Sequence, residues 1–101
     1  MEQITKADFD EEIKNGIVLV DFYANWCGPC KKLTLELEEL SKEMKQVKFY
    51  KVNIDIEHEL TKRFNIMSVP TILLFKEGEI VGKTSGYSPK QLIKGFIEKV
   101  M

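Results

Sequence analysis

The sequence has few of the residues that bind metals, with two cysteines and one histidine among 101 residues. A closed structural zinc site usually takes four such ligands. The single histidine, His58, lies far along the chain from the cysteines and stands between Glu57 and Glu59. We therefore predict no metal site and interpret His58 as an exposed residue at the start of a short helix. Zinc binding by the cysteine pair is the alternative, and it would be short of ligands.

Long apolar runs and an excess of charge are also absent. No stretch approaches the ~20 apolar residues that span a bilayer, and residues 1–6 lack the apolar run of a signal peptide. The formal net charge is -1, so no basic excess would attract nucleic acid or an anionic membrane. No linker, repeat or low-complexity segment divides the chain. We therefore predict one domain over residues 1–101, located in the cytoplasm, that binds neither nucleic acid nor membranes.

Both cysteines occur in one six-residue segment, Trp26–Lys31, which reads Trp-Cys-Gly-Pro-Cys-Lys. In a reducing compartment such a pair is typical of a catalytic or metal-binding site rather than of a structural disulfide. A bridge that closes so short a loop would also constrain the unfolded chain very little. The segment therefore indicates thiol–disulfide chemistry.

A helical pattern follows the cysteines, which predicts Cys27 at the N-terminus of a helix. Unsatisfied N–H groups and the helix dipole favour an anion there, and cysteines in such settings have pKa values of roughly 3.5–7.5. Cys30 lies one turn further on, within reach of a disulfide and deeper in the protein. This asymmetry predicts Cys27 as the attacking nucleophile and Cys30 as the resolving thiol. Gly28 and Pro29 keep the site uncovered and stiff.

The rest of the pattern predicts an α/β fold. Asp8 and Glu11 have the spacing of a capping box at a helix start, and Ser88 followed by Pro89 has the signature of another. The predicted order is βαβαβαββα, a mixed sheet between helices. The expected strands cover 3–5, 17–23, 47–54, 71–75 and 80–84, and the expected helices cover 8–15, the cysteine motif to 45, 57–64, and 89 onward.

With this order of elements, the segment Trp26–Lys31 makes the chain resemble the thioredoxin family over nearly its whole length. Further segments match the family's pattern: 20–24 before the motif, 51–55 in the next strand, 69–71 as a cis-proline loop, and 75–79 with the later Gly86. The resemblance implies the thioredoxin fold, an α/β fold whose central mixed sheet is flanked by helices on both faces. It also implies a general protein-disulfide reductase.

Asp21 is a carboxylate within an otherwise apolar strand, shortly before Cys27. A buried carboxylate must be paired or have a raised pKa. Lys51 interrupts the next strand in a similar way. The resemblance implies that these two residues form a buried acid and its lysine neighbour beneath the cysteines, with Asp21 as the proton acceptor that activates Cys30. A purely structural buried ion pair is the alternative.

Pro70 follows Val69 at the predicted start of a strand, and the resemblance implies a cis peptide bond between them. Such a loop would keep an amide away from the sulfur and leave the backbone of Val69 free to pair with an extended substrate segment. The implied docking surface around Cys27 is flat and mostly apolar, and consists of Trp26, Gly28, Pro29, Val69, Pro70 and Gly86. Core filling is the alternative for Trp26.

The resemblance further implies that no cofactor is bound and that the redox-active group is a Cys27–Cys30 disulfide. The substrates would be proteins with disulfides, an NADPH-dependent thioredoxin reductase would reset the protein, and it would act as a monomer. A disulfide oxidase or isomerase, or a non-catalytic adaptor on the same fold, are the alternatives. Gly28 and Pro29 are expected to tune the redox chemistry, and this dipeptide favours the reductase. The missing signal peptide favours it as well.

Two positions depart from the family pattern. Leu35 stands where the family usually has a proline that kinks the long helix, so a straighter helix is expected. Tyr23 replaces a common tryptophan, a change that is expected to affect fluorescence more than chemistry.

Overall fold

The computed structural model describes all 101 residues. Its elements follow the predicted order βαβαβαββα. The edge strand is shorter and earlier than the predicted 3–5, and the long helix ends slightly before residue 45. In chain order the elements are β1 (Glu2–Gln3), α1 (Lys6–Ile13), β2 (Ile17–Tyr23), α2 (Gly28–Glu43), β3 (Val47–Asn53), α3 (His58–Arg63), β4 (Thr71–Lys76), β5 (Glu79–Ser85) and α4 (Lys90–Glu98).

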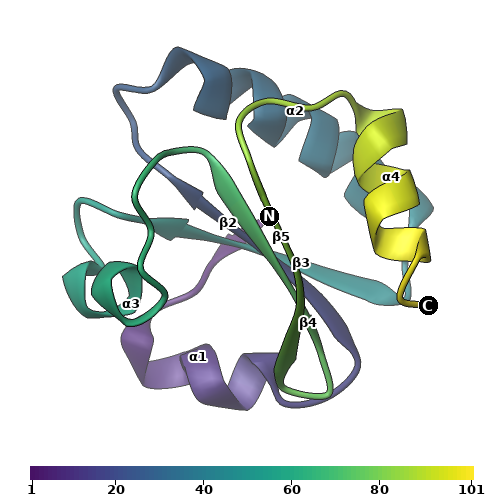
Figure 1. Ribbon diagram of the computed structural model, residues 1–101, viewed down its shortest axis with the longest axis horizontal. Helices are drawn as coiled ribbons and strands as arrows, with labels where there is room; N and C mark the ends of the chain where they lie inside the picture. The colour runs from purple at the N-terminus through teal and green to yellow at the C-terminus, as the bar shows by residue number, and fades with distance from the viewer.

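The strands form one mixed sheet in the order β1-β3-β2-β4-β5 (Figure 1). β3 pairs in parallel with β1 and β2, whereas β4 pairs antiparallel with β2 and β5. β2 is central because its residues are apolar on both faces and can be covered from both sides. It ends at Tyr23, so the cysteine segment follows directly after the central strand.

Helices cover both faces of the sheet. Figure 1 shows the sheet from its β5 edge, with α2 and α4 on one side of it and α1 and α3 on the other. Alternate residues of β2 divide between the two layers: Leu19 packs with α2 and α4, while Val18, Val20 and Phe22 pack with α1 and α3. The predicted α/β architecture is therefore confirmed. None of the helices combines the length and the apolar character needed to cross a membrane.

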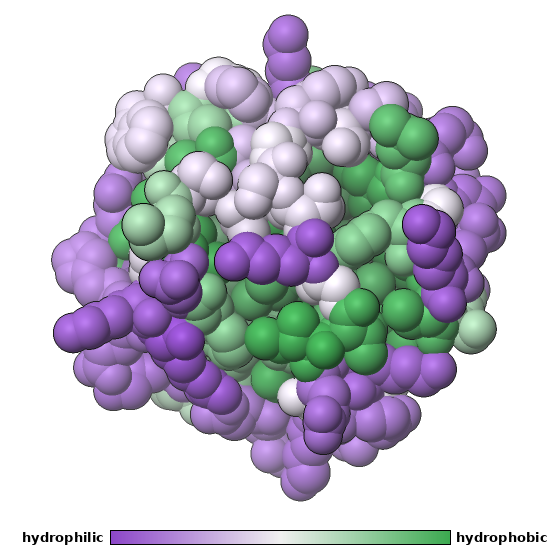
Figure 2. Space-filling view, in the orientation of Figure 1, coloured by the Kyte–Doolittle hydropathy of each residue, from purple (hydrophilic) through white to green (hydrophobic).

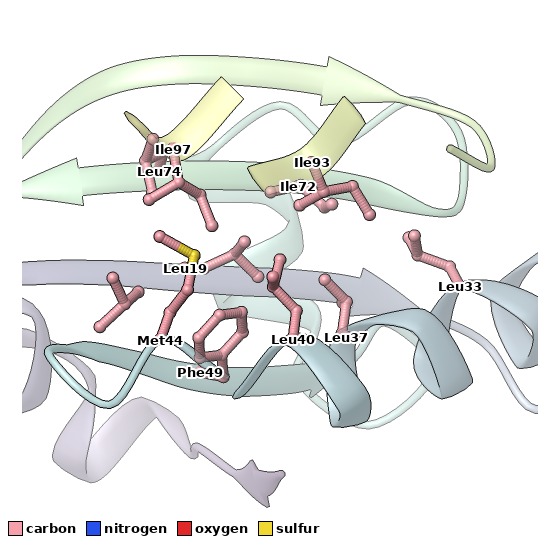
Figure 3. Packing of buried hydrophobic residues seen from close by; sticks show 11 residues of the cluster. Leu19, Leu33, Leu37, Leu40, Met44, Phe49, Ile72, Leu74, Ile93 and Ile97 are labelled. Carbon is pink, nitrogen blue, oxygen red and sulfur yellow. The ribbon is translucent and has the colours of Figure 1, made fainter. Parts of the chain in front are cut away.

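Packing between α2 and the sheet fixes the helix that follows the cysteines. Leu33, Leu37 and Leu40 recur at helical spacing and are fully buried. Figure 3 shows them in one layer with Leu19 of the sheet and Ile93 of α4. Burying each leucine contributes roughly 1.5–3 kcal/mol. This row of side chains therefore determines where the N-terminus of α2 lies.

The predicted start of the first helix is wrong. α1 begins at Lys6, with Thr5 as its N-cap and Asp8 in its first turn. The Thr5 carbonyl accepts a hydrogen bond from the Asp8 N–H (3.1 Å), so the helix has already begun at the position predicted for the cap. The Asp8 carboxylate instead interacts favourably with the positive end of the helix dipole.

The last helix begins one residue later than predicted. α4 starts at Lys90, and its N-cap is Pro89, which has no capping side chain. The Lys90 N–H donates to Oε1 of Glu36 on α2 (2.6 Å). A carboxylate from a neighbouring helix therefore does what the predicted Ser88 cap was expected to do.

β5 is the exposed edge of the sheet, and its Ile80 and Val81 side chains are 51% and 41% exposed. Figure 2 shows apolar surface across the middle of this face, with hydrophilic residues around its rim. The surface has intermediate hydropathy where the loop after β5 crosses toward α4. That loop carries Gly86, whose N–H donates to the Pro70 carbonyl (2.8 Å), so it runs from the sheet edge to the loop before β4.

Candidate active site

The cysteine pair lies at the N-terminus of α2, as predicted. Cys27 is the N-cap, and Cys30 lies in the first turn. The two residues form a disulfide, with their Cα atoms 5.2 Å apart. The Cys30 N–H donates to Cys27 Sγ (3.2 Å), so the sulfur occupies the position where a capping oxygen usually accepts. Because the first turn contains no acidic residue, the helix dipole and its free N–H groups favour a thiolate at Cys27 in the reduced protein.

The two cysteines differ in depth. Cys27 is 5% exposed and Cys30 is 1% exposed. Both pack against Tyr23 and Ala24 at the end of β2. Cys30 is the deeper of the two, which is the direction of the predicted asymmetry. Gly28 and Pro29 between them are exposed, so the backbone of the motif is open to a large substrate.

The loop before β4 lies against the disulfide. The Val69–Pro70 peptide bond is cis, as the resemblance implied. The Val69 carbonyl oxygen lies 3.8 Å from Cys27 Sγ. Gly86, which bonds to the Pro70 carbonyl, has a φ of 87°, a left-handed conformation that favours glycine. Val69 therefore lies beside Cys27, and Gly86 is joined to the same loop through Pro70, which is buried and not part of the exposed surface expected from the sequence.

Trp26 lies on the surface, because its side chain is 70% exposed. The alternative that it fills the core is therefore wrong. Its indole Nε1–H donates to Oδ2 of Asp55 (2.9 Å), which holds the ring beside Cys27. Sequence reasoning did not identify Asp55 as a site residue, although it ends the family-like segment 51–55.

Asp21 lies in β2, on the face of the sheet that the cysteine-bearing helix covers. On the face of β2 that α2 covers, it stands between Leu19, which packs against α2, and Tyr23, which packs against Cys30. The side chain is fully buried, and neither carboxylate oxygen has a hydrogen-bond partner. Burial raises the pKa of Asp21 from an ordinary 3.8 to about 7, and the charge of nearby Lys51 opposes this rise. The carboxyl group can therefore gain or lose a proton near neutral pH.

Lys51 pairs with Asp21 in the register of β2 and β3, yet its ammonium group lies over the Tyr23 ring, 5.4 Å from the ring centroid. The structural ion pair considered from the sequence is therefore not formed. Lys51 instead helps to line a pocket of about 220 Å³ that also includes Cys30, Lys31 and Thr34. This pocket opens a route from solvent to the deeper cysteine.

Two further residues near the motif were not identified from the sequence. Lys32 and Tyr87 line a second pocket, of about 290 Å³, together with Gly28 and Pro29. Tyr87 comes from the loop after β5, far along the chain from α2. The signal that could have found it is its position directly after Gly86.

No group of three or more histidine, cysteine, aspartate or glutamate side chains lies close enough together to hold a metal ion. His58 is the first residue of α3 and is exposed, as predicted.

Comparisons with known proteins agree with this geometry. The family model described as Thioredoxin matches residues 1–99. The thioredoxin of Bacillus subtilis (strain 168) is 40% identical over 96 residues, which cover 94% of this chain and 92% of that protein. A thioredoxin structure from Plasmodium falciparum has a TM-score of 0.92 at 39% identity and covers 100% of both chains.

A second similar structure comes from a study of thiol resolution in the yeast mitochondrial 1-Cys peroxiredoxin by the glutathione and thioredoxin systems. Its matching chain has a TM-score of 0.89 at 34% identity, and the match covers 98% of this chain and 94% of that chain.

Proposed function

This chain belongs to the thioredoxin family, and from that premise we propose how its residues carry out dithiol–disulfide exchange. It is a protein-disulfide oxidoreductase, and the disulfide-linked Cys27–Cys30 pair at the start of α2 is the observation that carries this conclusion. We propose that it acts as a general reductant of protein disulfides, as one thioredoxin domain over residues 1–101.

The first step is an attack by the Cys27 thiolate on one sulfur of a target disulfide. A mixed disulfide forms between Cys27 and the target, and the other target sulfur leaves as a thiolate. The position of Cys27 as the N-cap supports this role, because the Cys30 N–H already donates to its sulfur. Gly28 and Pro29 tune the reactivity by shaping this first turn.

The second step is an attack by Cys30 on Cys27 Sγ. Cys30 first gives its proton to Asp21; its thiolate then closes the Cys27–Cys30 disulfide, and the second target sulfur leaves as a thiolate. Two electrons pass in total from the cysteine pair to the target. A pKa of about 7 suits Asp21 to this transfer, because a general base works best near the operating pH. Lys51 helps to keep Asp21 ionised, since its charge opposes the effect of burial.

The substrate docks on the surface around Cys27. Trp26 offers an exposed aromatic ring held by Asp55, and the half-buried Val69 lies beside the sulfur. An extended substrate segment pairs with the backbone of Val69, in the manner of an added strand. The buried Pro70 supports this surface from below, and the exposed Gly86 is bonded to its carbonyl.

The partners follow from this chemistry. Members of the family reduce proteins that contain disulfides, and we propose the same class of substrate for this protein. We further propose that an NADPH-dependent thioredoxin reductase restores its dithiol after each cycle. The protein acts as a monomer in the cytoplasm and needs no cofactor beyond its own cysteine pair.

The reduction of insulin disulfides with dithiothreitol as electron source tests the proposal. We expect the wild-type protein to accelerate the reaction and Cys27→Ser to abolish the acceleration. Asp21→Asn should slow turnover by about 100-fold near neutral pH, the lower end of general-base effects, and by less in alkali, where Cys30 ionises unaided. A wild-type protein without activity would favour an adaptor, and an unchanged pH profile in Asp21→Asn would remove Asp21 from the mechanism.

A further inference from the structure

The pocket formed by Gly28, Pro29, Lys32 and Tyr87, here called the Lys32–Tyr87 pocket, adjoins the redox-active motif and has a volume of about 290 Å³. Gly28 and Lys32 are four residues apart on α2 and therefore lie on the same face of the helix. Tyr87 supplies the opposite wall from the loop after β5. The mechanism of disulfide exchange uses Gly28 and Pro29 but gives no role to Lys32 or Tyr87.

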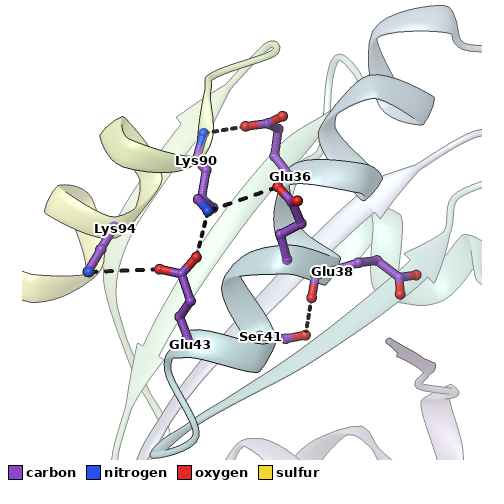
Figure 4. Close-up of polar contacts among 7 residues, drawn as sticks. Glu36, Glu38, Ser41, Glu43, Lys90 and Lys94 are labelled. Carbon is purple, nitrogen blue, oxygen red and sulfur yellow. Dashed lines mark hydrogen bonds and ion pairs between the residues drawn. The ribbon is translucent and has the colours of Figure 1, made fainter.

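Lys32 has no acidic partner within the protein, because it takes part in none of the ion pairs of the structure. The carboxylate one turn further along α2 is that of Glu36. Figure 4 shows Glu36 turned toward α4, where it accepts from the Lys90 N–H (2.6 Å). The ammonium group of Lys32 is therefore left to face solvent and the pocket.

The Tyr87 hydroxyl is also free. The tyrosine hydroxyls that make hydrogen bonds within the protein are those of Tyr23 and Tyr50. Tyr87 is 44% exposed. The pocket thus brings together an unpaired ammonium and an unpaired hydroxyl, and none of its four lining side chains carries a negative charge.

Charge is distributed unevenly about the cysteine pair. Lys31 and Lys32 both lie near the start of α2, where Lys31 lines the pocket that includes Cys30 and Lys32 lines the Lys32–Tyr87 pocket, and the first turn of the helix contains no acidic residue. Trp26, which precedes the helix, is bonded to the carboxylate of Asp55. A substrate that reaches the start of α2 therefore meets two lysines there, whereas the nearby carboxylate of Asp55 is already bonded to Trp26.

We propose that the Lys32–Tyr87 pocket binds an acidic side chain, Asp or Glu, that lies close in sequence to the target cysteine of a protein substrate. The Lys32 ammonium and the Tyr87 hydroxyl both donate to its carboxylate, which makes at least one charge-assisted hydrogen bond. The volume lies at the lower limit for small-molecule sites and suits a single side chain. This inference rests on the proposed function, because the acidic residue belongs to a disulfide-containing substrate.

The test uses pairs of short cyclic peptides, each closed by one disulfide and differing only by Glu or Gln at one position near a cysteine. The prereduced protein is mixed with each peptide, the reaction is quenched with acid, and the bimolecular rate constant is measured by chromatography. We expect the Glu peptide to react about fivefold faster than its Gln partner at one or more positions. The ratio should fall toward one as salt is raised, because exposed charges are screened.

Variants of exposed residues test which side chains cause the preference for Glu over Gln. Lys32→Gln should bring the Glu-to-Gln ratio close to one, and Lys32→Glu should invert it. Tyr87→Phe, which keeps the ring and removes the hydroxyl, should lower the ratio in part. Lys31→Gln is the matched control, because it removes a charge from the residue directly after Cys30, which lines the other pocket. It should keep the wild-type ratio.

Three results would overturn the inference. Equal rates for Glu and Gln peptides at every position would show that the pocket does not select acidic substrates, and the proposed function would still stand. An equal loss of the ratio in Lys31→Gln and Lys32→Gln would show a general effect of charge. Failure to reduce either peptide would contradict the proposed function and this inference together.

Discussion

Asp21 stands opposite Lys51 in the parallel pairing of β2 with β3, yet neither oxygen of its carboxylate has a hydrogen-bond partner. The Lys51 ammonium lies over the Tyr23 ring instead. A fully buried and unpaired carboxylate is costly to ionise, and no gain in stability explains its presence. Its raised pKa of about 7 supports our proposal that Asp21 accepts the proton of Cys30.

The first prediction concerns the effect of Asp21 on stability. Burial raises the pKa of Asp21 to about 7 in the folded protein, against an ordinary 3.8. The folded protein therefore binds this proton more tightly than the unfolded chain. The resulting stabilisation is fully present below about pH 4 and is lost as pH rises to about 7, a change of about 4 kcal/mol at 1.36 kcal/mol per pKa unit.

Denaturant unfolding of the oxidised protein at pH 5 and pH 8 measures this effect. Asp21→Asn should unfold at higher denaturant concentration than the wild-type protein at pH 8, and the difference should shrink at pH 5. Equal differences at the two pH values would show that Asp21 does not titrate between them.

The second prediction separates the two cysteines. Cys30→Ser should accumulate mixed disulfides with target proteins, because the resolving thiol is absent and Cys27 still attacks. Cys27→Ser should form none, since Cys30 is only 1% exposed. Non-reducing electrophoresis and mass spectrometry of the captured adducts measure this. Capture by Cys27→Ser and not by Cys30→Ser would reverse the assigned roles.

The third prediction concerns the cap of α4. Glu36 supplies the carboxylate that accepts from the Lys90 N–H, and α4 has no capping side chain of its own. Glu36→Ala should lower the free energy of unfolding by about 1 kcal/mol, as for the loss of an N-cap. Glu39→Ala is the control, because Glu39 lies 4.0 Å from Lys90 Nζ and is largely exposed; its effect should stay within about 0.5 kcal/mol. Equal effects of the two changes would argue against a cap by Glu36.

The fourth prediction concerns Leu35. It lies in the interior of α2, which runs without interruption from Gly28 to Glu43, and its side chain is 68% exposed. Leu35→Pro should lower the free energy of unfolding by about 3 kcal/mol, because proline removes a helical hydrogen bond and clashes with the preceding turn. Leu35→Ala should have little effect. If the proline variant changes neither the stability nor the redox potential, the departure from the family pattern has no consequence.

The sequence predicted what depends on local pattern and on the family motif. The apolar run that ends at Tyr23 predicted the central strand, and the Trp26–Lys31 segment predicted a reactive cysteine at a helix N-terminus. The cap of α4 could not be predicted, because it comes from Glu36 on another helix. The Lys32–Tyr87 pocket could not be predicted either, because only folding brings the loop after β5 to the start of α2.

The reduction potential of the Cys27–Cys30 pair tests the central claim most directly. It is measured by equilibrating the protein with dithiothreitol or glutathione buffers of known composition and quantifying the dithiol and disulfide forms. We predict a value of about -270 mV, the known potential of thioredoxin itself, which would make the pair a reductant of protein disulfides. A value of about -120 mV, as in a strong disulfide oxidant, would contradict the account.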